Sequence, residues 1–172
     1  MNIWFFVLLI LGVALVIGPV SMLRPKPAQR HKEMLRMTAA GQGVRFGLRT
    51  LPKLKTATED PSPTPVYYLS PTVKMQSLPT WTLMRTDYEH EGNFYQEWDF
   101  EGEYRPGATI CGFLKDILPT MPASVAAISQ GKAGTCVFWN EKGDLETLDA
   151  LVTMLKDLHN AVVTEITAQH LG

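Results

Sequence analysis

The sequence predicts an α+β protein with one N-terminal transmembrane helix, a basic stem, and a small antiparallel sheet with one or two covering helices. Three observations predict this class: an uncharged apolar run at the N-terminus, alternating strand patterns in the second half, and a helical stripe near the C-terminus. We divide the chain into a transmembrane anchor at 1–23, a basic juxtamembrane stem with a Pro-rich linker at 24–65, and a small cytoplasmic α+β domain at 66–172.

The apolar run extends from Ile3 to Leu23, which is 21 residues without a formal charge. At about 1.5 Å of rise per residue, a helix of this length matches the ~30 Å hydrocarbon core of a bilayer. A cleaved signal peptide is the alternative, but it would need a basic leading segment, a shorter apolar core and a small-residue cleavage site. Only Met1 and Asn2 precede the run, and no such cleavage pattern follows it. We therefore expect a retained, single-pass helix.

Basic residues follow the run at once, at Arg24, Lys26, Arg30, Lys32 and Arg36. Because Lys and Arg favour the cytoplasmic side of a span, this bias predicts a bacterial inner-membrane protein with its N-terminus outside and its C-terminal domain in the cytoplasm. The two cysteines, Cys111 and Cys136, suit a reducing compartment.

Charge is divided between two parts of the chain. Residues 24–55 hold nine basic residues and one acid, a net charge of +8, whereas residues 56–172 hold seven basic residues and 16 acids, a net charge of −9. Anionic headgroups attract a juxtamembrane basic segment by about 1 kcal/mol per basic residue. The five basic residues of the stem are therefore the candidate membrane-surface site, with anionic lipid as partner. No base-reading motif accompanies the charge, so we do not expect nucleic acid as a partner.

Hydrophobic spacing predicts the elements after the anchor. A short basic helix at 28–40 ends at Gly41, and a half-buried strand follows at 44–49. Residues 51–65 contain four prolines and are typical of a long loop. Further strands are predicted at 66–69, in a hairpin of 81–87 with 94–104, and in a second hairpin of 124–130 with 135–140; Thr109 is expected to cap a helix at 110–118.

The last predicted helix has the clearest pattern. Asp144 is a plausible N-cap, and apolar residues recur along one stripe at Leu148, Leu151, Leu155, Leu158, Val162 and Ile166. Two heptads are too few for a coiled coil, so a helix that covers a sheet is favoured. The pattern alone leaves open whether this stripe is core or a docking surface, and we expect Leu151 and Leu155 to be buried.

The most conspicuous polar cluster is an acidic ladder on one strand face, formed by Glu97, Asp99, Glu101 and Glu103. Carboxylates can bind a hard cation, but side chains two residues apart stand about 6.6 Å from each other, and no calcium-binding loop surrounds them. We interpret the ladder as a solvated strand face. We expect no metal or cofactor, because no zinc, dinucleotide or nucleophile-elbow motif is complete in the sequence.

Two function classes remain. The first is a non-enzymatic accessory or interaction subunit of a membrane complex, with a protein partner in the membrane. The second is a membrane-tethered enzyme whose pocket is assembled from residues scattered in the sequence, for which Asp87, His90 and Glu97 are the candidates. These classes are distinguished by whether such polar groups converge in a concave pocket.

One segment resembles a known family. Leu23-Arg24-Pro25, Arg30, Lys32-Glu33, Met34-Leu35, Gly41 and Val44 are similar to the junction in the small single-span accessory subunit of the bacterial Sec translocase complex. The likeness covers about 22 of the 172 residues. A compact glycine-rich β domain follows the junction in that family, whereas here a large acidic domain follows. The resemblance implies an accessory role without catalysis.

Overall fold

The computed structural model describes residues 3–22, 26–54, 60–71, 79–86 and 88–169, with side chains described at 3–15, 26–54, 60–71, 79–86 and 88–165. The chain forms two compact units, Met1–Met34 and Leu35–Gly172. The boundary falls inside the second helix. The second unit holds the sheet and therefore the candidate site.

Helix α1 covers Ile3–Met22 and is built from the apolar run. Within the described stretches of the chain, no helix has both the length and the apolarity that a membrane crossing requires. The predicted transmembrane anchor is therefore wrong. The predicted single-pass topology in the inner membrane, with the N-terminus outside and the C-terminal domain cytoplasmic, is overturned with it.

The fold of the described chain is α+β, with one six-stranded antiparallel sheet and four α-helices. The strands are β1 (Arg45–Thr50), β2 (Pro63–Leu69), β3 (Trp81–Arg85), β4 (Trp98–Glu101), β5 (Val125–Gly131) and β6 (Gly134–Trp139), in the sheet order β1-β2-β6-β5-β3-β4. The two predicted hairpins are present as the antiparallel pairs β3–β4 and β5–β6. Strands β1 and β4 form the two edges of the sheet.

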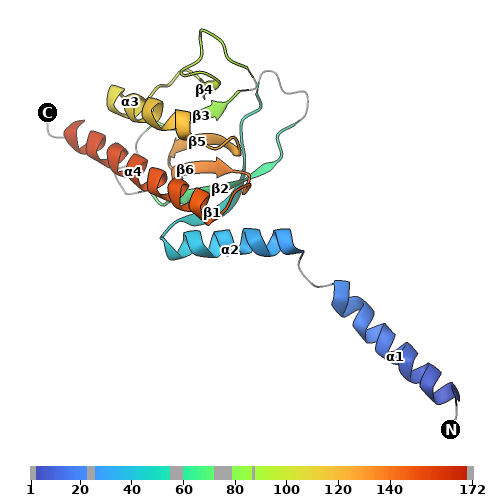
Figure 1. The fold of residues 1–172 in the computed structure, drawn as a ribbon. Helices are drawn as coiled ribbons and strands as arrows, with labels where there is room; N and C mark the ends of the chain where they lie inside the picture. Colours follow the sequence, from blue (N-terminus) through green and yellow to red (C-terminus); the bar gives the residue numbers. More distant parts are fainter. Residues whose placement is uncertain (1–2, 23–25, 55–59, 72–78, 87, 170–172) are drawn as a thin grey trace. The chain divides into compact units, whose positions relative to one another are not determined.

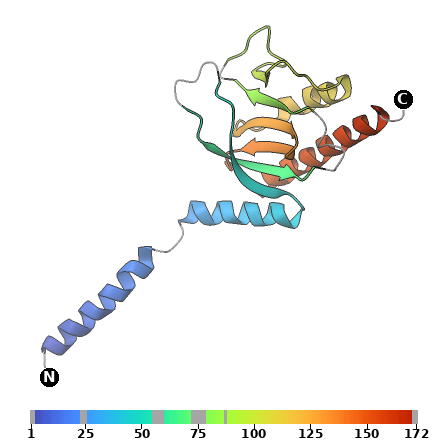
Figure 2. The ribbon, with the colours of Figure 1, turned by 180° about the vertical axis from the view of Figure 1, so that it is seen from behind.

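Helices α3 (Ala108–Ile117) and α4 (Leu145–Gln169) lie on the same side of the sheet, as both views show (Figures 1 and 2). A short 3₁₀ turn, η2 (Leu118–Thr120), follows α3 because Pro119 cannot continue the α-helix. Gly107, rather than Thr109, precedes α3 and makes no side-chain capping bond. Asp144 caps α4 as predicted, since its Oδ1 accepts the backbone N–H of Thr147 at 2.9 Å.

The stripe of α4 is core. All of its members with a described side chain are at least 95% buried, and they pack with the helix-facing side chains of the sheet in the larger apolar cluster: Leu148, Leu151, Leu155, Leu158 and Val162. A smaller cluster forms on the opposite face of the sheet, from Val66, Met84, Ala127, Cys136 and Phe138, with Leu51 and Leu54 packed against it. Both faces of the sheet are therefore apolar near the centre.

Helix α2 (Pro27–Gly41) contributes its C-terminal half to the same core, because Leu35 and Ala39 are fully buried in the larger cluster. Arg36 forms a bidentate ion pair with Glu141, with Nε to Oε1 at 2.6 Å and Nη2 to Oε2 at 2.8 Å. The hydroxyl of Tyr67 donates to the same carboxylate at 3.0 Å. These contacts place the start of the compact unit at Leu35, well before the expected domain start at residue 66.

Candidate binding cleft

A cleft of about 360 Å³ lies at the β3–β4 side of the sheet. Met84, which lines it, belongs to the apolar cluster on the face opposite α3 and α4. The volume is at the lower end of the range for sites that bind small molecules or a few side chains. The described residues that line it are Leu54, Met84, Thr86, Tyr88, Asp99, Phe100, Glu101, Gly102, Glu103 and Arg105.

The alternation of β4 builds one wall of the cleft. Trp98 and Phe100 point into the larger core, where they are at least 95% buried. Asp99 lies between these two residues, and Glu101 follows Phe100. Because side chains alternate along a strand, Asp99 and Glu101 project to the opposite face of the sheet. Gly102 follows with a φ of +77°, a conformation that favours glycine, and the chain turns there before Glu103. Three of the four carboxylates of the predicted acidic ladder therefore line the cleft.

Arg105 is the one basic side chain among the described residues of the lining. Its Nη1 donates to the carbonyl of Gly102 at 2.7 Å, its guanidinium lies 4.9 Å from the centre of the Phe100 ring, and its Nη2 is 3.8 Å from Oδ1 of Asp99. Arg105 thus offsets the charge of Asp99. Glu101 and Glu103 are exposed, and neither has an ion-pair partner in the part of the chain that the structure describes.

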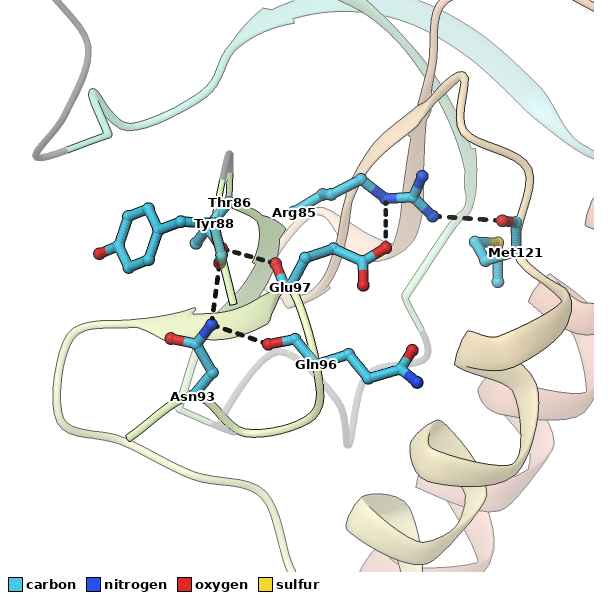
Figure 3. Close-up of polar contacts among 7 residues, drawn as sticks. All are labelled: Arg85, Thr86, Tyr88, Asn93, Gln96, Glu97 and Met121. Atoms are coloured by element: carbon cyan, nitrogen blue, oxygen red, sulfur yellow. Dashed lines mark hydrogen bonds and ion pairs between the residues drawn. The ribbon is translucent and has the colours of Figure 1, made fainter. Parts of the chain in front are cut away.

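A hydrogen-bonded loop after β3 supports the rim (Figure 3). The Thr86 hydroxyl lies 2.6 Å from the carbonyl oxygen of Tyr88 and 2.8 Å from that of Glu97, and its one proton is available to both acceptors. The Asn93 amide donates to the carbonyls of Tyr88 and Gln96 at 3.2 and 2.7 Å, and Gln96 has a φ of +47°. These bonds, which use the Thr86 hydroxyl and the Tyr88 carbonyl, hold the two residues in place at the cleft.

Arg85 connects the same hairpin to the turn before β5. Its Nη2 donates to the Met121 carbonyl at 3.2 Å, its Nε lies 3.7 Å from Oε1 of Glu97, and its guanidinium stacks 4.7 Å from the Trp98 ring (Figure 3). Glu97, the remaining member of the acidic ladder, is therefore a partner of Arg85 rather than a wall of the cleft.

The two candidate residues for an enzyme that the structure describes, His90 and Glu97, do not meet in the cleft. Asp87 lies outside the described residues. The His90 Nδ1 accepts the backbone N–H of Gly92 at 3.0 Å in an exposed turn, and Glu97 pairs with Arg85. Neither His90 nor Glu97 lines the cleft. Among the described side chains, no group of three or more His, Cys, Asp or Glu is placed to hold a metal ion.

The candidate membrane-surface residues have different environments. Arg24 lies outside the described residues, Lys26 and Arg30 are exposed, and Lys32 is half-buried. Arg36 is held in the ion pair with Glu141, and its guanidinium also lies 4.0 Å from the centre of the Phe46 ring. Lipid binding by this set stays a prediction.

Sequence reasoning found the acidic wall but missed the cleft. The signal it had was the alternation of acidic and aromatic residues at 97–103, which predicts one polar face. The apolar floor comes from Leu54 and Met84, which are distant in sequence and meet only in the folded chain.

No family model, curated protein or solved structure matches this chain. The resemblance of the 23–44 segment to the Sec accessory subunit therefore stays a prediction.

Proposed function

We propose that this chain is a non-enzymatic interaction protein whose C-terminal domain binds a basic segment of a protein partner in the cleft beside β4. The observation that supports this proposal is the combination of three carboxylates with an apolar floor in one cavity of about 360 Å³. Lys and Arg bury their methylene stems along apolar surface while their charged ends stay at polar groups. Such a cleft therefore suits basic side chains, because its apolar floor can contact the methylene stem and its carboxylates can pair with the charged end.

The charge of the lining supports the same class of ligand. Asp99, Glu101 and Glu103 outnumber Arg105, so the cleft has an excess of negative charge. Residues 56–172 as a whole have a net charge of −9. A field of one sign over a concave surface raises the local concentration of ligands of the opposite sign and speeds their association.

The test is the binding of a dye-labelled peptide of alternating Lys and Leu to the full chain, measured by fluorescence anisotropy. The matched control peptide alternates Glu and Leu. We expect saturable binding of the Lys peptide alone, and weaker binding at high salt, because exposed charges are screened beyond about 10 Å at 0.1 M salt. Equal binding of both peptides would contradict the proposal.

The variant for this test combines Glu101→Gln with Glu103→Gln. Each exposed ion pair contributes about 0.2 to 1 kcal/mol, so we expect the pair of substitutions to weaken binding of the Lys peptide by about two- to thirtyfold. Asp157→Asn is the matched control, because Asp157 is an exposed carboxylate on α4 and does not line the cleft. Unchanged binding by the double variant would rule out the cleft as the site.

A further inference from the structure

We infer that the basic segment bound in the cleft is the N-terminal half of α2 from a second copy of the same chain, so that copies associate head to tail. This inference rests on the proposed function and names the partner. Its first support is the division of charge, since residues 24–55 have a net charge of +8 and residues 56–172 a net charge of −9. Each copy therefore holds both members of a complementary pair.

The basic side chains of α2 are divided between two roles. In the C-terminal half, Arg36 is already paired with Glu141. At the start of the helix, Lys26 directly precedes α2 and Arg30 lies in its first turn; both are exposed, and neither has an ion-pair partner among the side chains that the structure describes. Lys26 and Arg30 are therefore two exposed cations at the start of α2 that can reach another molecule.

The spacing of these cations fits the spacing of the cleft carboxylates. The Arg30 N–H donates to the Lys26 carbonyl at 3.1 Å, so the two residues are one helical turn apart, and side chains in this relation are about 5 to 6 Å apart. Glu101 and Glu103 are two residues apart on an extended chain that turns at Gly102, and two residues span at most about 7 Å. The first turn of α2 and the residue before it can thus present two cations to two carboxylates, with their stems along Leu54 and Met84.

The association that follows has a definite form. The basic helix of one copy and the acidic cleft of the next are different surfaces, so the contact is heterologous, and such contacts build rings or open filaments. Because the contact is between exposed charges, we expect salt to weaken it.

The experiment is a charge exchange in the full chain, followed by sedimentation velocity over a range of concentrations. The cleft variant combines Glu101→Lys with Glu103→Lys, and the helix variant combines Lys26→Glu with Arg30→Glu. Each variant alone places like charges opposite each other, and we expect its salt-sensitive association to weaken at least about tenfold. An equimolar mixture of the two variants restores opposite charges at both kinds of contact, so we expect association to return.

The controls reverse charges of the same sign elsewhere. Asp157→Lys on α4 and Arg45→Glu on β1 change exposed residues that lie outside the cleft and outside the N-terminal half of α2. We expect both to associate like the parent chain. Helix α1 is unchanged in every variant, so any association through its apolar side chains is a constant background.

Three results would overturn the inference. If both variants associate like the parent while the Lys peptide still binds the cleft, the proposed function stands and the second copy is not the partner. If the Lys peptide also fails to bind, the proposed function and the inference are both wrong. If the two variants do not associate when mixed, but a chain with all four substitutions sediments as a compact species at every concentration, the helix and the cleft pair within one chain. If the helix variant loses binding to phosphatidylserine vesicles while association is unchanged, Lys26 and Arg30 serve a lipid surface instead.

Discussion

At the scale of single residues, the charge network around Glu141 joins three separate segments of the chain. The Glu141 side chain is fully buried, whereas that of Arg36 is 34% exposed. Glu141 also has a φ of +56°, a conformation that non-glycine residues rarely adopt. A buried carboxylate that receives a bidentate guanidinium and a tyrosine hydroxyl fixes the turn between β6 and α4 and the end of α2 together.

We predict that Arg36→Ala destabilises the fold more than Glu141→Gln does. Removing the guanidinium leaves a negative charge in a place that water does not reach, which typically costs about 3 to 5 kcal/mol. In Glu141→Gln the charge left behind is that of Arg36, which can reach water. Urea unfolding of both variants, followed by the fluorescence of the buried tryptophans, measures the difference. A larger loss for Glu141→Gln would mean that Glu141 stabilises the fold mainly through partners other than Arg36.

A second residue-scale prediction concerns pH. His159 on α4 lies 3.1 Å, through Nδ1, from the Thr135 hydroxyl, and burial lowers its pKa below the ordinary value of 6.5. As pH falls through 6.5, the unfolded chain therefore binds a proton on this residue before the folded chain does. The free energy of unfolding should therefore decrease as the pH is lowered below 6.5.

The measurement is the unfolding free energy of the parent chain and of His159→Gln between pH 7.5 and 5. We expect the parent to lose more stability over this window, because glutamine does not titrate. Parallel curves for the two chains would show that the imidazole has the same pKa in the folded and unfolded states.

At the scale of elements, helix α4 was the best predicted part of the fold. Its stripe repeats at helical spacing and its N-cap is an aspartate, so local chemistry and tertiary packing agree. The hairpins were also predictable, because alternation is a local signal. Helix α3 shows where one local signal fails: Thr109 is a good capping residue, but the chain enters α3 from Gly107. The helical spacing of Ile110 and Leu114 was a better guide, because both residues are buried.

We predict that Leu155→Ala destabilises the fold by about 2 to 5 kcal/mol, as large-to-small changes in a packed core do. Leu155 is completely buried against the sheet, whereas Leu145, at the start of the same helix, is 40% exposed. Leu145→Ala is therefore the matched control, and we expect a much smaller change. Thermal or urea unfolding of the two variants measures the stability that each substitution removes. Similar melting for Leu155→Ala and the parent chain would contradict the assignment of the stripe to the core.

At the scale of the whole molecule, sequence reasoning could not locate the start of the domain or the cleft. The Pro-rich segment at 51–65 has the composition of a linker, but Leu51 and Leu54 within it pack on the sheet, and α2 before it supplies Leu35 and Ala39 to the core. These contacts join residues that are far apart in sequence, so no local pattern signals them. The same holds for the floor of the cleft, which Leu54 and Met84 form together.

The last prediction concerns α1, whose large apolar side chains from Ile3 to Leu15 are 45% to 77% exposed. Apolar surface of this kind marks a contact with other apolar surface. Among the described residues, neither apolar cluster of the domain contains a residue before Leu35. A chain that begins at Lys26 should therefore melt within about 2 °C of the full chain, because the side chains of α1 that the structure describes belong to neither cluster.

Removing residues 1–25 should nevertheless change how the chain associates. Contacts between apolar side chains are not weakened by added salt, whereas contacts between exposed charges are. In sedimentation velocity at low and high salt, we expect the shortened chain to lose the salt-insensitive part of its association and to keep the salt-sensitive part that depends on Lys26 and Arg30. If the shortened chain instead melts without cooperativity, residues 1–25 are needed to complete the fold, and α1 is part of the core rather than a contact surface.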